Sequence, residues 1–240
     1  MNSQNNMPEK NSNKNPTKKI VVCGCSFSLP GQSGIETIWS QHLQNLLTIP
    51  VVNITKDAGA GNSEILRRIT EYCWSNDISQ TGFIIQWSSI DRLEFCDEHD
   101  WYSTKRSYED KPVQLKLNKI KEAQAYTYCE STYLWQFIQQ ILALKALMDE
   151  KSCRYFQVYC VGSVLNDFLH QVKDSYFSKH GKQIFKSLSS TKWLMNNILN
   201  ADLSNKGYPV VSKQDLHFNQ QGHSMIADTM SRHIKKEKWL

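Results

Sequence analysis

The fold of this chain is decided by the segment Lys19-Ile20-Val21-Val22-Cys23-Gly24-Cys25-Ser26-Phe27-Ser28. Its apolar run at 20–23 predicts a short buried strand between a basic stretch and a turn. The turn continues through Leu-Pro-Gly-Gln-Ser-Gly at 29–34, a composition that breaks regular structure. Ser26 is therefore expected at the carboxyl end of a strand, where open α/β sheets bind their ligands.

Further apolar runs predict the rest of a parallel sheet. They lie at 50–54, 83–86 and 155–161, and a short run at 208–211 is expected at a sheet edge because Pro209 cannot donate to a ladder. Strands that alternate with helices favour an α/β fold with helices on both faces of the sheet.

Helices are predicted where apolar residues recur with a helical period. One is expected to open at the capping-box spacing of Ser33 and Glu36, and a second to follow the Gly59-x-Gly61 turn with Asn62 or Ser63 as its N-cap. The remaining predicted helices are a long one at 121–149, an interrupted one at 164–200 and a last one after Gly222. The segment 95–120 shows no clean period, so we expect a long loop or insertion that acts as a lid.

Composition narrows the class of protein. The 240 residues suit one domain, with residues 1–18 as a disordered basic leader and 19–240 as the folded body. Net charge is +5, but the first 19 residues carry four Lys and one Glu, so the body has a net charge of only +2 and no nucleic-acid partner is expected. Seven cysteines without metal-ligand spacing predict reduced thiols, no metal and a cytoplasmic location. No apolar run is long enough for a membrane span.

Chemistry-bearing residues gather at the predicted strand ends. Acyl transfer needs a nucleophile, a base, a partner that orients the base and donors for an oxyanion. Ser26 is the candidate nucleophile, His217 the base and Asp215, two residues away in the same loop, its orienting carboxylate. Gly61 at a helix start supplies a candidate oxyanion donor.

These residues and their order resemble the SGNH (GDSL-type) hydrolases. The segment 24–28 resembles the first block of that family, the segment from Asn53 to Ser63 its second block, and Asp215-x-His217 its fifth block. The resemblance covers about residues 19–235 and implies a three-layer, flavodoxin-like, five-stranded parallel sheet. It also implies an esterase with Ser26, Asp215 and His217 as its catalytic set, Gly61 in its oxyanion hole and no cofactor.

Two positions depart from the family pattern. Cys25 stands where the family has an Asp beside the nucleophile, and Ser88 and Ser89 stand where its third block offers an Asn to the oxyanion. Ser89 is the expected replacement donor and Ser88 its alternative, although a hydroxyl is less preorganised than an amide.

Several assignments keep an alternative. His223 is a second candidate base, Gly59 a second oxyanion donor and Cys25 a second nucleophile. Arg92 is expected to bind substrate by holding an anionic group, to hold the lid, or to form a structural ion pair.

The sequence predicts a serine-dependent ester hydrolase. The aromatic residues at 95–108 suggest that its substrate is an O-acylated carbohydrate, such as an O-acetylated glycan. The alternative is a catalytically silent module of the same fold that binds a glycan or a protein partner.

Overall fold

A computed structural model describes most of the folded chain. The described residues are 15–31, 34–56, 58–90, 92, 94–96, 101–103, 111–127, 130–159, 193–195, 208–212, 214–215 and 217–240.

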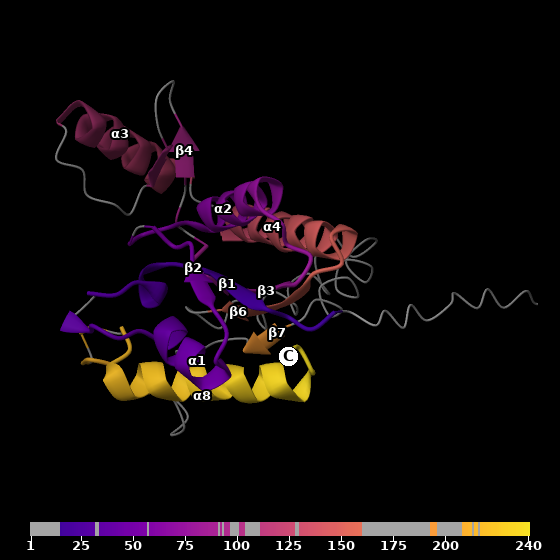
Figure 1. Ribbon diagram of the computed structural model, residues 1–240. Coiled ribbons are helices and arrows are strands. Elements are labelled where there is room, and N and C mark those ends of the chain that lie inside the picture. Colours follow the sequence, from indigo (N-terminus) through magenta and orange to yellow (C-terminus); the bar gives the residue numbers. More distant parts are fainter. Residues whose placement is uncertain are drawn as a thin grey trace, which may run out of the picture.

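A five-stranded sheet forms the centre of the molecule (Figure 1). Its strand order is β2-β1-β3-β6-β7, and every neighbouring pair is parallel. The strands are β1 (Lys19–Cys23), β2 (Val51–Asn53), β3 (Thr81–Trp87), β6 (Arg154–Tyr159) and β7 (Trp193–Met195). Strand β1 lies inside the sheet, between β2 and β3, so that the segment after it opens near the middle of the sheet edge. The α/β class and the parallel five-stranded sheet are as predicted.

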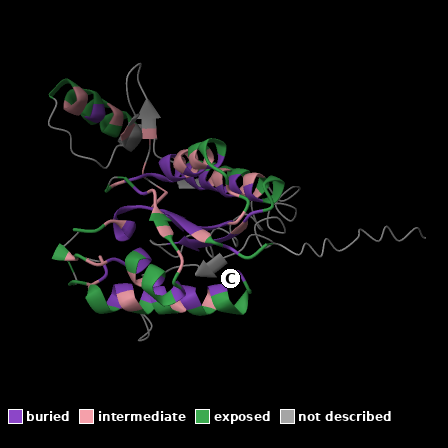
Figure 2. Ribbon diagram, in the orientation of Figure 1, coloured by how far each residue is buried: buried purple, intermediate pink, exposed green. Residues whose placement is uncertain are grey.

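Helices cover both faces of this sheet (Figure 1). Helices α1 (Trp39–Leu47) and α8 (Gln220–Lys236) lie on one face, and α2 (Asn62–Ser75) and α4 (Glu130–Glu150) on the other. Side chains along β1 alternate between the two cores: Val21 and Cys23 pack toward α2 and α4, while Ile20 and Val22 pack toward α1 and α8. Burial on both faces explains the apolar runs of β1, β3 and β6, and Figure 2 shows these strands buried between the helical layers.

The fifth strand is not where the sequence predicted it. Residues 208–211 contribute only an isolated antiparallel bridge between Val210 and Phe218, while β7 at 193–195 completes the sheet. Strand β7 falls inside the segment 164–200 for which a helix was predicted, and the rest of that segment, apart from 193–195, lies outside the described residues. A three-residue strand has too short a pattern to separate it from a helix in the sequence.

Two helix boundaries also differ from the prediction. Helix α1 begins at Trp39 and not at the Ser33–Glu36 spacing, because the side chain of Gln41 accepts a hydrogen bond from the backbone N–H of Ile38 and caps the helix there. The long helix predicted at 121–149 is two helices, α3 (Lys111–Thr127) and α4.

The segment 95–120 contains regular structure and is not a plain loop. Strands β4 (Glu94–Cys96) and β5 (Trp101–Ser103) form an antiparallel hairpin, and α3 begins at Lys111. Hairpin and helix stand off from the body in Figure 1. The ion pair between Arg67 Nη2 on α2 and Glu94 Oε1 on β4, at 2.5 Å, ties the base of the hairpin to the body. A role as a lid stays a prediction.

The folded body extends slightly before residue 19. Thr17 is buried and its N–H donates to the carbonyl oxygen of Trp239, while the N–H of Lys18 donates to the carbonyl oxygen of Gln80. The predicted leader therefore ends before Thr17, because these two residues are bonded to the body; residues 1–14 lie outside the described residues.

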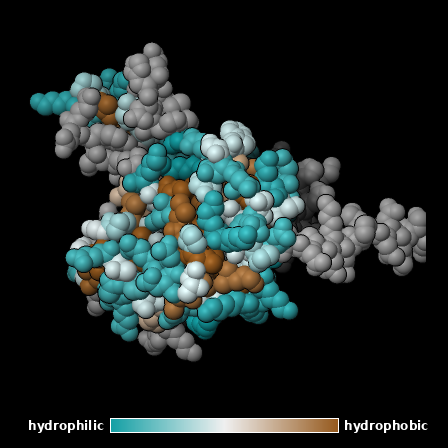
Figure 3. Space-filling model, viewed as in Figure 1, coloured by the Kyte–Doolittle hydropathy of each residue, from teal (hydrophilic) through white to brown (hydrophobic). Residues whose placement is uncertain are grey.

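The surface is mixed in character. On the face shown in Figure 3, apolar side chains gather between the two helical layers, where the edge strand β2 runs and Val52 is exposed. Within the described part of the chain, none of the helices combines the length and apolar character needed to cross a membrane.

Candidate active site

Ser26 lies directly after β1 in a single turn of 3-10 helix, Ser26–Ser28. The backbone N–H of Gly24 donates to Thr55 Oγ1 at 2.9 Å, and the N–H of Ser28 donates to the carbonyl oxygen of Cys25 at 2.8 Å. These bonds end the strand at Cys23 and turn the chain, so that Ser26 projects from the carboxyl edge of the sheet. Ser26 is only 6% exposed.

Two further hydrogen bonds join this turn to the neighbouring strands. The Ser28 hydroxyl donates to Gln86 Oε1 on β3, and Asn53 Nδ2 on β2 donates to the Ser28 carbonyl oxygen. Gly24 is required here, because a Cβ at this position would lie 2.6 Å from Gln86 Oε1 and 2.6 Å from Ser28 Oγ. Side chains from the neighbouring strands β2 and β3 therefore fix the turn that carries Ser26.

His217 approaches Ser26 from the loop before α8. Its Nε2 lies 3.0 Å from Ser26 Oγ, and its Nδ1 lies 2.7 Å from Asp215 Oδ1. The same Asp215 oxygen accepts the backbone N–H of His217 at 3.1 Å, so that a spacing of two residues is enough to close the contact. The structure thus brings together the three side chains that the sequence proposed as a catalytic set.

The ring of Phe27 supports the imidazole. The two rings stack with centroids 4.7 Å apart and an interplanar angle of 29°, and Phe27 also packs against Phe218. The loop itself is closed by the N–H of Val211 donating to the His217 carbonyl oxygen. An imidazole that is stacked on one side and bonded at both nitrogens has little freedom to rotate, which is the preorganisation that general-base catalysis needs.

The arrangement has the geometry for proton transfer from a serine hydroxyl. With the Nδ1 proton donated to Asp215, Nε2 is free to accept the proton of Ser26. In such a transfer Asp215 would stabilise the imidazolium. The described residues contain no group of three or more side chains arranged to hold a metal ion.

His223 has a different environment from His217. It is 3% exposed, and its Nδ1 accepts the backbone N–H of Trp39 at 3.2 Å, at the start of α1. The pKa of His223 is lowered to about 4, mainly by burial and in smaller part by the nearby His42 and His217. Asn219 caps α8 through Gly222. His223 is therefore a neutral packing residue that links two helices.

The cysteines beside Ser26 face the interior. Cys23 and Cys25 are both buried in the two core clusters. Burial raises the pKa of the Cys23 thiol to about 12. The side chain opposite His217 Nε2 is that of Ser26 and not that of Cys25.

The residue predicted to donate to an oxyanion, Gly61, lies at the start of α2. Gly61 is the N-cap of this helix, and a Cβ there would lie 2.6 Å from the carbonyl oxygen of Arg92. Asn62 is not an N-cap: its Oδ1 accepts the N–H of Ser88 at 2.7 Å and its Nδ2 donates to the Ser88 carbonyl oxygen at 3.1 Å. This clamp joins the Gly61 turn to the end of β3, and the only sign of it in the sequence is an Asn at a helix start.

The two candidate serine donors differ in exposure. Ser88 is fully buried, and its Oγ is shielded from solvent without a hydrogen-bond partner. Ser89 is partly exposed. Ser89 is therefore the better placed of the two to meet a substrate.

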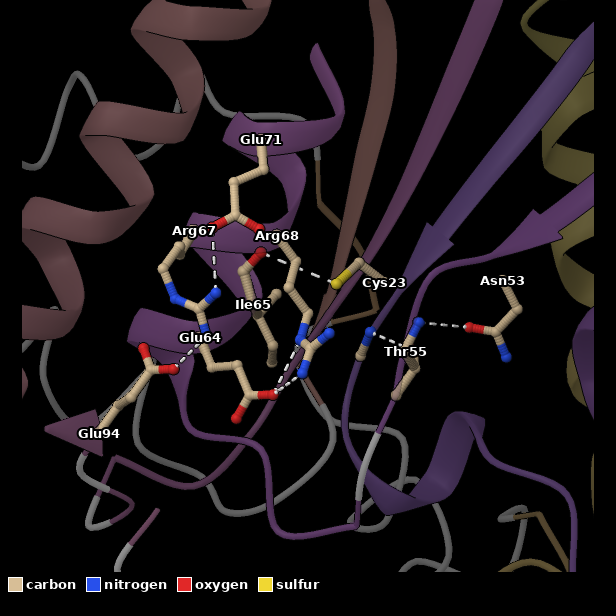
Figure 4. Close-up of polar contacts among 10 residues, drawn as sticks. Cys23, Asn53, Thr55, Glu64, Ile65, Arg67, Arg68, Glu71 and Glu94 are labelled. Carbon is tan, nitrogen blue, oxygen red and sulfur yellow. Dashed lines mark hydrogen bonds and ion pairs between the residues drawn. The ribbon is translucent and has the colours of Figure 1, made fainter. Parts of the chain in front are cut away.

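A charged network lies behind the glycine turn (Figure 4). The carboxylate of Glu64, buried on α2, pairs with Arg68 at 2.5 Å, and Arg67 is held between Glu71 and Glu94. Burial raises the pKa of the Glu94 carboxyl, and Arg67 opposes that effect. The network stiffens the first turns of α2, which carry Gly61 and Asn62.

The chain was compared with known protein families, sequences and solved structures, and only the solved structures are similar to it. No protein-family model and no curated protein sequence matches the chain. Among solved structures, a protein assigned to the G-D-S-L family of lipolytic proteins from Desulfitobacterium hafniense is similar, at 14% identity and a TM-score of 0.51, over 90% of this chain and 99% of that one. A catalytic histidine mutant of an acetylxylan esterase from Geobacillus stearothermophilus is similar at 14% identity and a TM-score of 0.50, over 92% and 96% of the two chains. The fold implied by the resemblance to the SGNH hydrolases is thus confirmed.

Proposed function

We propose that the chain is a serine-dependent ester hydrolase with Ser26 as nucleophile, His217 as general base and Asp215 as its orienting carboxylate. One observation carries the proposal: the continuous hydrogen-bonded path from Ser26 Oγ through both ring nitrogens of His217 to Asp215 Oδ1. In a chain of this fold, such a path at the carboxyl edge of the sheet is the machinery of acyl transfer.

The reaction then follows in two halves. Ser26 Oγ attacks the ester carbonyl carbon while its proton moves to His217 Nε2, and the backbone N–H of Gly61 and the hydroxyl of Ser89 donate to the oxyanion. His217 returns the proton to the leaving alcohol, and an acyl-enzyme remains on Ser26. Water attacks this acyl group while its proton moves to His217, and His217 then returns the proton to Ser26 Oγ as the acid is released.

For the substrate we propose an O-acylated carbohydrate. The Geobacillus protein of the same fold is an acetylxylan esterase, and the structures of that enzyme include catalytic mutants at a serine and at a histidine. The sequence of the hairpin segment adds Trp101 and Tyr102, aromatic residues suited to stack on sugar rings.

The test is hydrolysis of para-nitrophenyl acetate, followed by acetate release from O-acetylated xylo-oligosaccharides. We expect Ser26→Ala and His217→Ala each to lower kcat by at least about 10³-fold, and the double variant to be hardly slower than either, because the two residues act as one unit. Ser75→Ala and His42→Ala are matched controls outside the site and should retain the parent rate.

The outcomes separate the two candidate functions. Turnover that survives in folded Ser26→Ala would remove Ser26 as nucleophile. A folded parent that hydrolyses no short-chain ester would leave the silent binding module as the function of this fold. Activity on the aryl ester without acetate release from the oligosaccharides would reject the carbohydrate substrate alone.

A further inference from the structure

Arg92 lies against the glycine that we propose as oxyanion donor. Its carbonyl oxygen occupies the space that a Cβ on Gly61 would need, at 2.6 Å. The turn that brings it there is closed by the N–H of Arg92, which donates to the carbonyl oxygen of Ser89 at 3.4 Å. The guanidinium of Arg92 therefore lies within one side-chain length of the Gly61 turn.

One nitrogen of the Arg92 guanidinium, Nη1, has no hydrogen-bond acceptor. Nη1 of Arg92 is shielded from solvent and makes no hydrogen bond, and within the described ranges Arg92 forms no ion pair. The neighbouring arginines differ: Arg67 is paired with Glu94 and Glu71, and Arg68 with Glu64. The structural ion pair that the sequence left open for Arg92 is thus absent among these residues.

An unpaired, partly desolvated cation on a residue that contacts the Gly61 turn favours the binding of an anion. Withdrawing a charged N–H from water without an acceptor is costly, and a carboxylate or phosphate removes that cost with charge-assisted hydrogen bonds. Arg92 as a whole residue remains partly exposed although Nη1 is shielded, so a bound molecule can contact this side chain.

We propose that Arg92 recognises an anionic group on the ester substrate, a carboxylate or phosphate carried by the acyl or the alcohol part. The inference rests on the proposed esterase function and narrows it: the ester substrate carries a negative charge on its acyl part or on its alcohol part. The planar guanidinium suits this role because it offers paired donors to two oxygens of one anion.

The experiment compares substrates that differ only in charge. One pair is para-nitrophenyl hemisuccinate and its methyl ester, which places the charge on the acyl side; nitrophenolate release is followed. The other pairs place the charge on the alcohol side: meta-acetoxybenzoate with its methyl ester, and meta-acetoxyphenyl phosphate with its dimethyl ester; release of the phenol is followed. The readout is the ratio of kcat/KM for the anionic ester to kcat/KM for its neutral partner.

We expect the parent to favour the anionic ester in at least one pair, and to lose that preference as salt concentration rises. Arg92→Gln should lower the ratio roughly 10- to 100-fold, and Arg92→Lys, which keeps the charge without the fork, should lower it less. Arg232→Gln, at an exposed arginine on α8, is the matched control and should leave the ratio unchanged.

A parent that hydrolyses the neutral esters and shows no preference for any anionic partner overturns the assignment of Arg92 while the esterase function stands. This measurement needs no variant, so it decides the matter even if Arg92→Gln fails to fold. A folded Arg92→Gln variant with the same ratio of anionic to neutral kcat/KM as the parent also overturns the assignment of Arg92. Absence of turnover on every ester would reject the esterase function and the inference together.

Discussion

The side chain of Asn62 makes two hydrogen bonds to the backbone of Ser88, accepting its N–H at 2.7 Å and donating to its carbonyl oxygen at 3.1 Å. All of these atoms are buried, since Asn62 is 3% and Ser88 0% exposed. The clamp fixes the distance between the first residue of α2 and the end of β3. It therefore sets the position of Gly61 relative to the turn that carries Ser89 and Arg92.

Replacing Asn62 tests this clamp. Asn62→Ala leaves the Ser88 backbone groups buried without partners, which should lower the free energy of unfolding by about 1–3 kcal/mol. Because the oxyanion donors would lose their fixed geometry, kcat on a short-chain ester should fall with little change in KM. Urea unfolding and steady-state kinetics measure the two effects. Asn76→Ala, at an exposed asparagine that bonds only the Tyr72 carbonyl oxygen, is the control and should change neither.

The two glycines before α2 should respond differently to alanine. Gly61 has an ordinary φ of −85°, so Gly61→Ala is opposed by the Arg92 carbonyl oxygen and not by the backbone. Gly59 has a φ of +84°, so Gly59→Ala costs about 1–2 kcal/mol of stability through backbone strain. We expect Gly61→Ala to lower kcat by about 10²-fold or more and Gly59→Ala to act on the melting temperature. The opposite pattern would make Gly59 the oxyanion donor.

Thr55 provides a conservative test of the nucleophile turn. Thr55→Val keeps the shape of the side chain but removes the oxygen that accepts the Gly24 N–H, whereas Thr55→Ser retains it. We expect Thr55→Val to lower kcat more than KM, because the Ser26 turn loses its anchor, and Thr55→Ser to restore most of the rate. Equal kinetics in the two variants would show that this bond does not position Ser26.

The sequence predicted the parts of the fold that local patterns encode. Strands β1, β3 and β6 are long apolar runs, and α8 has a clear helical period, so each was found near its observed place. The meeting of Ser26 with His217 was expected because carboxyl ends of parallel strands share one edge of the sheet. Their roles in catalysis stay predictions.

The parts that were missed depend on tertiary contacts. The edge strand β7 has three residues, and among the residues of α3 whose burial is described only Leu117 is fully buried, so β7 and the start of α3 have too little pattern to be recognised. The bonds from Asn62 to Ser88 and from Ser28 to Gln86 join residues far apart in the chain. A sequence shows the donors and acceptors of such bonds but not their pairing.

Acid should destabilise the fold through His223. The folded state holds the pKa of this residue at about 4, below the ordinary value of 6.5, because burial disfavours the charged ring. Between these two values the unfolded chain binds a proton that the folded chain does not, so stability falls as pH falls through this window. The free energy of unfolding should drop by on the order of 3 kcal/mol.

The control for this pH dependence keeps the hydrogen bond and removes the titration. In His223→Gln, the amide oxygen can accept the N–H of Trp39 but does not ionise, so the loss of stability between pH 6.5 and pH 4 should be smaller than in the parent. Urea midpoints measured across this range decide the question. Identical pH profiles would assign the acid sensitivity to other groups.

The most direct test of the central claim is covalent labelling of the nucleophile. A fluorophosphonate ester reacts with an activated serine hydroxyl, and peptide mass spectrometry identifies the modified residue. We predict a single adduct on Ser26 in the parent, none in Ser26→Ala, and strongly slowed labelling in His217→Ala, because the serine is activated by its hydrogen bond to His217 Nε2. A folded parent that stays unlabelled, or that carries the adduct on Cys25 or any other residue, would contradict the assignment of Ser26 as a nucleophile activated by His217.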